Sequence, residues 1–358
     1  MKWPDTDTAV ALREAFAART VPDPASAWRQ PFARVPRHVF VPRFYEQDSD
    51  GAWTARNWGD EGYLDAVYRD EALTTQLDDQ QIPTSSSSQP SVMHTMLDAL
   101  DPQPGHQILE LGTGTGYNLA LLVDRVGDSH VVSLEPDTEL AATAIRHLQQ
   151  TGHAPMVIAA DGLQGYARRA PYDRIIATVG LTHIPPALVD QAVPGGRIVV
   201  PLGYGIAVLT VTGPERAEGR FLSAPAYFMP VRGERATPDF AAASAAPATV
   251  TKVEPEQVTG RLKFVLALAL PGHATCTFAA REGERPSVGL WLPDGSTAIV
   301  RADGHAHQSG PTRLWDIVER AAAELPEQIE RTRFRVEIAP GRQMVSFDGG
   351  PHWRLDRS

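Results

Sequence analysis

The stretch ILELGTGTGYN, residues 108–118, has three alternate glycines directly after an apolar run and directly before a helical pattern. Gly112, Gly114 and Gly116 have no side chain, so the backbone there can come close to a ligand. A loop just beyond the carboxyl end of a strand is the place where an α/β sheet binds ligands. A tight turn without a ligand is the alternative interpretation of the same glycines. The stretch predicts a strand, a ligand-binding loop and a helix.

Short apolar runs alternate with amphipathic segments from residue 108 onward, at the spacing that βαβ units have. The amphipathic segments have apolar residues at helical spacing, and two of them end at Gly127 and Gly152. A further helix is expected at Ser91–Leu100. The pattern predicts an α/β fold with a doubly wound sheet, parallel in its core, and helices on both faces. The expected strands are Ile108–Leu111, Val131–Leu134, Met156–Ala159, Arg174–Thr178 and Ile198–Val200.

Two acidic residues stand at the ends of the second and third expected strands. Glu135 ends the second strand, where a carboxylate can accept both ribose hydroxyl protons of an adenine nucleoside. Asp161 ends the third strand, where it can accept the adenine amino group, and Gly162 beside it avoids a clash. A solvated loop acid and an ordinary Asp-Gly turn are the plainer interpretations. Three signals at successive strand ends favour a nucleoside cofactor.

Glu110, two residues before the first glycine, bears on which cofactor binds. NAD remains possible from the glycines and acids alone, but no residue for hydride transfer is evident. A carboxylate such as Glu110 suits the sulfonium cation and the amino acid moiety of S-adenosylmethionine. The residues therefore favour S-adenosylmethionine, with S-adenosylhomocysteine as its product.

Several motifs resemble those of the protein-L-isoaspartate (D-aspartate) O-methyltransferase family. The resemblance implies a Rossmann-like class I methyltransferase sheet and a peptide or protein partner that carries aspartate or isoaspartate. It implies cofactor contacts for the glycine loop and both strand-end acids: Ser86, Gly112, Thr113, Gly114, Glu135, Asp161 and Gly162, to which the loop pattern adds Glu110 and Gly116. The motifs are VPRHVFVP at 35–42, SSSQP at 86–90, residues 109–118, PYDRII at 171–176, IPPAL at 184–188 and PGGR at 194–197.

Ser88 is the candidate catalytic residue, because it matches the serine to which the family's activity is attributed. A carboxylate acceptor is already ionised at neutral pH, so methyl transfer needs no general base. Catalysis then depends on alignment and on removal of water, and a hydroxyl can orient the carboxylate. Taken alone, Ser85–Ser88 would suit a flexible polar linker. Beside Gln89-Pro90 and a helix, it is better interpreted as an ordered lid over the cofactor.

The chain departs from the family pattern at residues 177–183, ATVGLTH, where a run of small residues is usual. That loop faces the acceptor, so Thr178 and His183 are candidate substrate-binding residues. A lone loop histidine is more often a surface residue. His94, on the helix after the serines, is expected to pack or to hydrogen-bond on the helix face.

An insertion follows Pro42, and roughly 145 further residues follow the methyltransferase core. This combination resembles the branch that acts on ribosomally synthesised, post-translationally modified peptides of lanthipeptide, lasso peptide or graspetide pathways. In that branch an ordinary aspartate is esterified, and the next backbone amide displaces the ester to give aspartimide or, after hydrolysis, isoaspartate.

The sequence predicts four segments: an N-terminal cap of helix and irregular structure (1–80), the methyltransferase core (81–235), a linker or mobile loop (236–250) and an α+β accessory domain (251–358). The accessory elements expected are strands at Arg261–Leu270, Thr275–Ala280, Ser287–Leu292, Thr297–Arg301 and Phe334–Ile338, and a helix at Leu314–Leu325.

The composition argues against some classes of binding partner. A formal charge of -10 and a pI near 5.6 argue against a nucleic acid partner. No apolar run approaches the length of a membrane span, so no membrane is expected either. A single cysteine, Cys276, and an N-terminus without a secretory pattern favour the cytoplasm. No metal site is expected, since His305 and His307 lie in a Gly-rich turn without further ligands.

Three functions remain open. The first is a peptide-tailoring aspartate methyltransferase, favoured by the tail and the insertion. The second is a repair methyltransferase for isoaspartyl residues, the family's usual activity. The third, from another class, is a module that binds a peptide or adenosine ligand without chemistry. The intact glycine loop with Glu135, Asp161 and Ser88 argues against the third.

Overall fold

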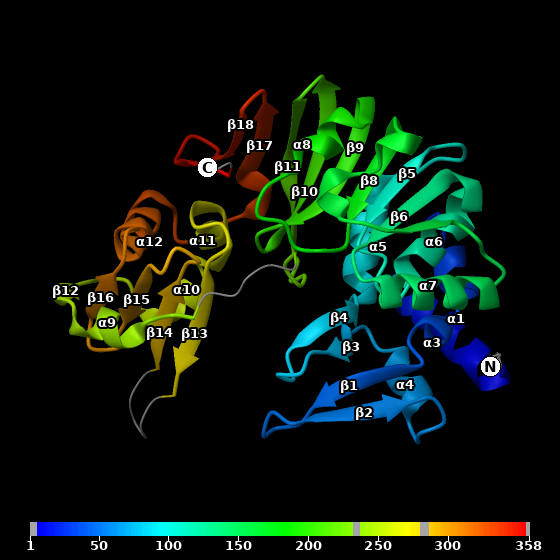
Figure 1. The fold of residues 1–358 in the computed structure, drawn as a ribbon, viewed down its shortest axis with the longest axis horizontal. Coiled ribbons are helices and arrows are strands. Elements are labelled where there is room, and N and C mark those ends of the chain that lie inside the picture. The colour runs from blue at the N-terminus through cyan, green and yellow to red at the C-terminus, as the bar shows by residue number, and fades with distance from the viewer. Residues whose placement is uncertain (1–5, 232–236, 280–285, 356–358) are drawn as a thin grey trace. The chain divides into compact units, whose positions relative to one another are not determined.

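The computed structural model contains five adjacent parallel strands that form one part of a ten-stranded sheet: β5 (Ile108–Leu111), β6 (Val131–Glu135), β7 (Met156–Ala159), β8 (Tyr172–Ala177) and β9 (Ala192–Leu202). Their order is β7-β6-β5-β8-β9. Figure 1 labels β6, β5, β8 and β9 in this order. The order reverses at β5, with β6 and β7 on one side and β8 and β9 on the other. The carboxyl ends of β5 and β8 therefore flank the switch point where such a sheet binds ligands. The predicted α/β fold is confirmed.

The structure describes residues 6–231, 237–279 and 286–355, and the chain forms two compact units. The accessory unit includes two short segments that precede residue 216 in the chain, residues 180–184 and 201–207. The core unit comprises residues 1–179, 185–200 and 208–215, and the accessory unit comprises 180–184, 201–207 and 216–358.

Amphipathic helices cover the parallel sheet. α6 (Tyr117–Val126) and α7 (Thr138–Gln150) pack on β6, and α7 also packs on β7. Leu119 and Leu122 of α6 are fully buried, as their helical spacing predicts. α5 (Pro90–Leu100), expected from Ser91, packs on β8. α8 (Pro186–Asp190) lies between β8 and β9 in the chain.

The N-terminal segment contains strands where helix and irregular structure are expected. Four strands form an antiparallel sheet in the order β2-β1-β3-β4. The prediction missed β4 because its sequence is PTSSS, in which the two inward-facing residues are Ser85 and Ser87 instead of apolar residues. The strands are β1 (Arg43–Gln47), β2 (Trp53–Asn57), β3 (Leu73–Leu77) and β4 (Pro83–Ser87), and the helices are α1 (Asp7–Thr20), α2 (Arg29–Arg34), α3 (Arg37–Phe40) and α4 (Tyr63–Val67).

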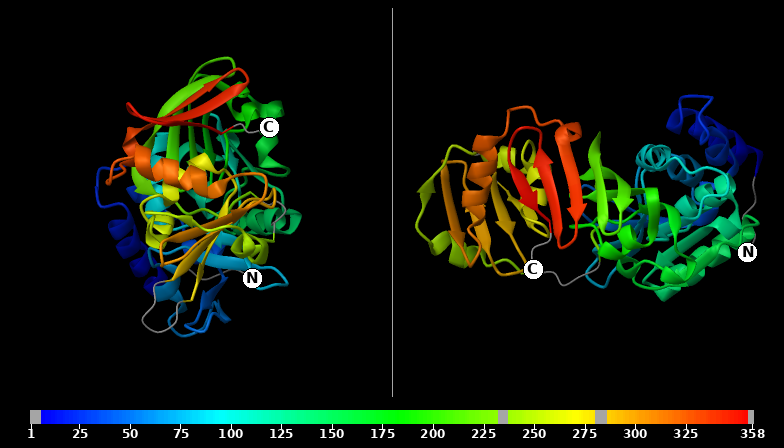
Figure 2. Two further views of the ribbon diagram at one scale, coloured as in Figure 1. Left: turned by 90° about the vertical axis from the view of Figure 1, so that its left-hand side faces the viewer. Right: turned by 90° about the horizontal axis from the view of Figure 1, so that it is seen from above.

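The accessory unit has a five-stranded antiparallel sheet, β12-β16-β15-β14-β13, on which α12 (Leu314–Glu324) packs (Figure 2). A second group, β11-β17-β18-β19, is also antiparallel where its pairing is described. The α+β character predicted for this region is present. The strands are β11 (Arg216–Pro225), β12 (Thr249–Val250), β13 (Ala274–Phe278), β14 (Ser287–Trp291), β15 (Thr297–Val300), β16 (His305–Ser309), β17 (Phe334–Ala339), β18 (Arg342–Phe347) and β19 (His352–Arg354); β10 (Gly205–Gly213) follows β9 along the chain.

Two expectations for the accessory unit are wrong. Residues 261–270, expected as a strand, contain helix α11 (Lys263–Ala269), preceded in the chain by helix α10 (Pro255–Thr259). Most residues of α11 are buried, so its sequence is apolar nearly throughout. It therefore lacks the alternation of apolar and polar residues that identifies a helix in a sequence. His305 and His307 lie on strand β16 instead of in a turn.

The stretch expected as a linker, residues 236–250, is structured where it is described. It contains helix α9 (Phe240–Ala245), capped by Asp239, which accepts from the backbone N–H of Ala242 at 2.8 Å. The ring of Phe240 packs against Gly289, where a side chain would collide with it. The packing of Phe240 and the pairing of Thr249 and Val250 with β16 therefore hold a stretch whose composition suggested mobility. Ala236 lies outside the described residues.

Candidate active site

The glycine loop follows β5 and turns into α6. Gly112, Gly114 and Gly116 all have positive φ, at 90°, 52° and 88°, a region that favours glycine. The backbone N–H groups of Gly112 and Thr113 both donate to the Leu134 carbonyl on β6, at 2.8 and 3.2 Å. The loop is therefore tied to the neighbouring strand, and its conformation requires the glycines that the sequence supplies.

Thr178, the residue after β8, is hydrogen-bonded to the same loop. Its backbone N–H donates to the Leu111 carbonyl at 2.9 Å, and its hydroxyl donates to the Gly112 carbonyl at 2.7 Å. A Cβ on Gly112 would lie 3.0 Å from the Thr178 Oγ1 atom. Thr178 was expected to face the acceptor; the structure places its hydroxyl on the glycine loop.

Glu135 ends β6 and Asp161 follows β7, as the sequence predicts. The two side chains differ in their exposure to solvent. Glu135 is buried, and its carboxylate accepts from the backbone N–H groups of Gly114 (2.9 Å) and Asp137 (3.2 Å). Asp161 is exposed and accepts from the Leu163 N–H at 3.0 Å. A Cβ on Gly162 would lie 3.1 Å from the Leu111 side chain of β5, so this position needs a small residue.

Glu110 has no exposed surface and lies below the loop. Its oxygens accept from the Asn118 amide and the Ser133 hydroxyl, both at 2.6 Å, and Thr113 Oγ1 lies 2.6 Å from Ser133 Oγ. Burial raises the pKa of Glu110 to about 7, although both hydrogen bonds lower it. The carboxylate thus supports Thr113 and α6 from inside instead of facing a ligand.

The serine strand β4 reaches the glycine loop from the N-terminal sheet. A Cβ on Gly114 would lie 3.8 Å from the Ser86 carbonyl oxygen. Ser86 pairs with Thr74 of β3, so the serine run is part of a sheet and not a linker. Ser88 follows the strand and is half-buried. Among the described residues, no hydrogen bond involves its hydroxyl, which is therefore available to a ligand.

Arg37 donates hydrogen bonds to the backbone at the end of the serine strand. Its side chain is completely buried, and burial lowers its pKa to about 10. Its guanidinium donates to carbonyl oxygens of two separate segments, and among the described residues no carboxylate accepts a hydrogen bond from it. Desolvating the charge is costly, and these carbonyls offset that cost. The acceptors are the carbonyl oxygens of Val67 (3.0 Å), Arg69 (2.9 Å), Glu71 (2.9 Å), Ser88 (3.2 Å) and Ser87 (3.5 Å).

Asp70 fixes the start of α5, immediately after Ser88. One of its carboxylate oxygens accepts from the Ser91 backbone N–H at 2.8 Å, and the other accepts from the Gln89 side-chain amide at 3.2 Å. A carboxylate at a helix N-terminus satisfies N–H groups that have no partner within the helix. The segment with Arg69 and Glu71 therefore holds both the serines and the helix after them.

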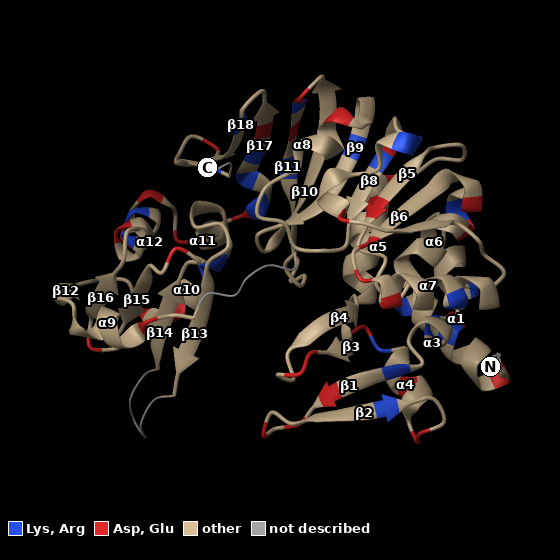
Figure 3. Cartoon of the chain, in the orientation of Figure 1, with Lys and Arg blue, Asp and Glu red and all other residues tan. Residues whose placement is uncertain are grey.

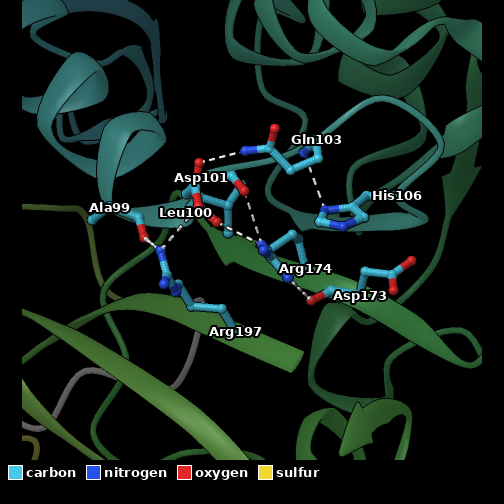
Figure 4. Close-up of polar contacts among 8 residues, drawn as sticks. All are labelled: Ala99, Leu100, Asp101, Gln103, His106, Asp173, Arg174 and Arg197. Carbon is cyan, nitrogen blue, oxygen red and sulfur yellow. Dashed lines mark hydrogen bonds and ion pairs between the residues drawn. The ribbon is translucent and has the colours of Figure 1, made fainter. Parts of the chain in front are cut away.

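Two arginines hold the other end of α5 (Figure 4). Arg174 of β8 donates through Nε to the Leu100 carbonyl at 2.7 Å, and Arg197 of β9 donates to the Ala99 carbonyl at 2.8 Å. Asp101, which has a positive φ of 49°, lies 3.9 Å from Arg197. The last carbonyls of the helix are thus capped by the sheet. Neither the arginine cap nor Arg37 was singled out as a site residue, because their acceptors are backbone atoms.

His183 belongs to the accessory unit, in the segment 180–184. It is half-buried, and its Nδ1 lies 3.3 Å from the Thr182 hydroxyl. The structure therefore gives it no tie to the glycine loop, and a substrate contact remains a proposal. His94 is also half-buried and lies edge-on to Phe32 at 6.3 Å, the packing role that was expected.

Within residues 6–231, 237–279 and 286–355, no group of three or more His, Cys, Asp or Glu side chains could hold a metal ion. In the same part of the chain, no helix combines the length and the apolar character that crossing a bilayer requires.

Comparison with known proteins points to one family. A family model described as protein-L-isoaspartate(D-aspartate) O-methyltransferase matches residues 51–213. Protein-L-isoaspartate O-methyltransferase 2 of Archaeoglobus fulgidus is 34% identical over 210 residues, 56% of this chain and 83% of the relative. The protein-L-isoaspartate O-methyltransferase of Methanopyrus kandleri is 35% identical over 173 residues, 48% of this chain. The match spans 66% of that relative's length.

A solved structure described as a protein-L-isoaspartate O-methyltransferase has the same fold. It covers 94% of this chain and 99% of its own, with a TM-score of 0.55 and 19% sequence identity. A fold of this extent, accessory part included, therefore occurs outside this chain.

Proposed function

Because the chain belongs to the protein-L-isoaspartate O-methyltransferase family, we propose that it transfers a methyl group from S-adenosylmethionine to a carboxylate of an aspartate-derived residue in a peptide or protein. One observation carries the proposal: the glycine loop, the Glu135 carboxylate and the serine strand meet at one edge of the sheet. Glu135 is bonded to Gly114, and Gly114 lies against Ser86.

The residues present fit this cofactor. Glu135 is a buried acid at the end of β6 that can bind ribose hydroxyls, and Gly112 and Gly114 have backbone conformations open to close approach. Asp161 and Gly162 follow the next strand and would hold the adenine. When bound, S-adenosylmethionine supplies a methyl group activated by a positively charged sulfur.

The chain's own contribution to the reaction is alignment. An acceptor carboxylate is ionised at neutral pH, so no residue needs to remove a proton. The Ser88 hydroxyl can donate a hydrogen bond to one carboxylate oxygen and leave the other directed at the methyl group. Arg37 and Asp70 fix the backbone on either side of Ser88, which lowers the entropy lost when the acceptor is aligned.

The acceptor named for the relatives is isoaspartate, and we take it as the first candidate. A second candidate is an ordinary aspartate in a modified precursor peptide. It rests on the resemblance to the peptide-modifying branch, which residues 177–183 and the insertion after Pro42 imply. The β1–β2 hairpin forms within that insertion. The residues after the methyltransferase core do not favour either candidate, because a solved structure described as a protein-L-isoaspartate O-methyltransferase covers 94% of this chain.

The second candidate has a consistent chemistry. Methylation makes the side-chain carboxyl neutral and converts it into an ester. The following backbone amide nitrogen then bonds to the ester carbonyl carbon, methanol leaves, and the nitrogen loses its proton. The product is an aspartimide, which water opens to aspartate or isoaspartate.

Matched peptides test the function and separate the acceptors. The protein would be incubated with labelled S-adenosylmethionine and a linear isoaspartyl peptide, its normal aspartyl counterpart, or a cyclic aspartyl peptide. Methylation of the isoaspartyl peptide alone supports the first candidate, and methylation of the cyclic aspartyl peptide supports the second. If calorimetry detects S-adenosylmethionine binding but no peptide is methylated, a binding module is the better description. Absence of binding at millimolar cofactor would refute the proposal.

A further inference from the structure

The four-stranded sheet of the core unit has one buried face and one face that is more open to solvent. On the buried face, Phe44 of β1 contacts Tyr63 of α4, with ring centres 6.0 Å apart. Ser87 of β4 is also buried. Side chains alternate between the two faces along each strand, so Tyr45 and Ser86 lie on the more open face. We call it the Ser86 face.

The strand register places Tyr45, Thr74 and Ser86 in one row across the Ser86 face. Tyr45 pairs with Thr74 of β3, and Thr74 pairs with Ser86 of β4. Directly opposed residues of antiparallel strands project from the same face, and all three side chains here are half-buried. Because Ser86 borders the glycine loop and Ser88 follows two residues later, the row leads from the candidate active site to β1.

Arg43 is the unpaired charge of this sheet. Strands β1 to β4 contain three charged residues, Arg43, Glu46 and Arg56, and both signs occur on the β1–β2 hairpin (Figure 3). Glu46 and Arg56 form an ion pair at 2.7 Å. Arg43 is exposed, and among the described residues no carboxylate oxygen lies within 4.0 Å of its guanidinium. Its position on β1, two residues before Tyr45, puts it on the Ser86 face.

Tyr45 supports the Arg43 guanidinium. The Cζ atom of Arg43 lies over the Tyr45 ring, 4.9 Å from its centre. The ring face attracts the cation, while the N–H groups at the edge of the guanidinium plane remain open to a ligand. Their fork geometry matches the two oxygens of a carboxylate. We call these two residues the Arg43–Tyr45 pair.

We propose that the Arg43–Tyr45 pair binds a carboxylate of the acceptor peptide, at an Asp or Glu residue other than the one that is methylated. The inference rests on the proposed function, because it takes the bound peptide to be the methyl acceptor. The peptide would run in an extended conformation from Ser88 across Thr74 to β1. All of these residues belong to the core unit. The pair would thus select acceptors with a second acidic residue at a set distance.

The register predicts that distance. Neighbouring strands are about 4.8 Å apart, so the backbone of Tyr45 lies about 10 Å to the side of Ser86. Ser88 is about 7 Å further along the strand direction, which separates Ser88 from Tyr45 by about 12 Å. An extended peptide rises about 3.3 Å per residue, so the second acidic residue should stand about three to five residues from the acceptor.

A scanning peptide series tests the pair. N-acetylated, C-terminally amidated isoaspartyl peptides would carry a single Glu, or a matched Gln, at each of the six positions on either side of the acceptor. Glu about three to five residues away, on one side, should lower KM roughly two- to fivefold relative to Gln, the size of an exposed ion pair. The preference should shrink at high salt. If the aspartyl peptide is the one methylated, the series is built on it.

Variants assign that preference to the pair. Arg43→Met should remove the difference between Glu and Gln peptides, and Arg43→Lys should keep only part of it, because lysine has a charge but no planar fork. Tyr45→Leu should weaken the preference while the Arg43 charge remains. Arg146→Met is the matched control, an exposed arginine on α7 of the same unit, and it should keep the full preference. A Glu preference that survives Arg43→Met, one confined to the neighbours of the acceptor, or none at any position would overturn the inference.

Failure of the proposed function would give a different result. Peptide affinity can be measured by fluorescence anisotropy without any methyl transfer, so the comparison of Glu and Gln peptides remains valid for an inactive protein. Turnover without a charge preference refutes the role of the Arg43–Tyr45 pair alone. An Arg43-dependent preference without turnover refutes the proposed reaction alone.

Discussion

The side chain of Gln343 makes both of its amide hydrogen bonds to the backbone of one residue, Ile184. Its carbonyl oxygen accepts from the Ile184 N–H at 2.9 Å, and its amide donates to the Ile184 carbonyl at 2.6 Å. Both residues are buried, and 159 positions separate them in the chain. This pair explains why residues 180–184 belong to the accessory unit, although the sequence places them within the methyltransferase core.

Replacing Gln343 should destabilise the accessory unit. In Gln343→Leu the N–H and the carbonyl of Ile184 lose their partners while remaining buried, which costs about 2–4 kcal/mol for the two groups together. Urea unfolding followed by circular dichroism measures the loss. Gln328→Leu, at an exposed position of the same unit, should change stability by less than about 0.5 kcal/mol. Equal effects of both substitutions would show that the Ile184 bonds are not important.

Ser88→Ala should slow methyl transfer at least about tenfold, the loss of one orienting hydrogen bond in the transition state. Cofactor affinity should stay within about twofold, because the Ser88 hydroxyl has no hydrogen bond to the loop among the described residues. Calorimetry and turnover measure the two quantities separately. Ser129→Ala, at an exposed serine, is the control. Parallel loss of affinity and turnover would mean that Ser88 contacts the cofactor or supports the fold.

Arg37→Met should lower both stability and turnover. It leaves several buried carbonyls without a donor, so we expect a loss of about 3 kcal/mol or more in the free energy of unfolding. Arg37→Lys keeps the charge and three donors and should recover part of the turnover. Arg34→Met removes an ion pair between the exposed Arg34 and the largely buried Asp124, and it should cost less than Arg37→Met, about 1 kcal/mol.

The positioning effect of Arg37 is separable from its effect on stability. At a temperature where Arg37→Lys is fully folded, its kcat should still be reduced while its cofactor affinity matches the wild type. A variant that is folded and fully active would show that Arg37 serves the fold alone.

Glu110→Gln should change the pH dependence of stability. The pKa of Glu110 is raised in the folded chain from 4.5 to about 7, so the folded state holds a proton that the unfolded state releases between these values. The stability this group contributes is present below pH 4.5 and is lost as the pH rises through 7. The wild type should therefore lose about 2–3 kcal/mol relative to Glu110→Gln between pH 4.5 and pH 8. Urea unfolding at both pH values measures it; a constant difference would contradict the raised pKa.

The sequence predicted the parallel sheet well because its signals are local. Each strand there is a short apolar run, and each helix has an apolar face, as in α6 with Leu119 and Leu122. The glycines form the predicted loop between a strand and a helix, and Glu135 stands where a strand-end acid was expected. These features depend on a few neighbouring residues and can be read from them.

The remaining features depend on partners that are distant in the chain. β4 pairs with β3 through serines, which have no apolar alternation. α11 is buried on nearly every side, so its periodicity is hidden. Arg37 appeared only as part of a family motif, because the carbonyls it binds have no sequence signature. Backbone acceptors are identical at every position, and only the folded chain shows which of them an arginine will reach.

Arg37 also limits how the serine strand can be moved by protein engineering. A single cation joins residues 67–71 to residues 87 and 88, so a loop graft that transfers only SSSQP to another scaffold would leave those carbonyls in a different arrangement. A transplant would have to include α3, the segment after α4 and the strand together, which is nearly the whole stretch from 35 to 90. The shortest segment that could be transferred with this site intact is therefore much longer than the SSSQP motif.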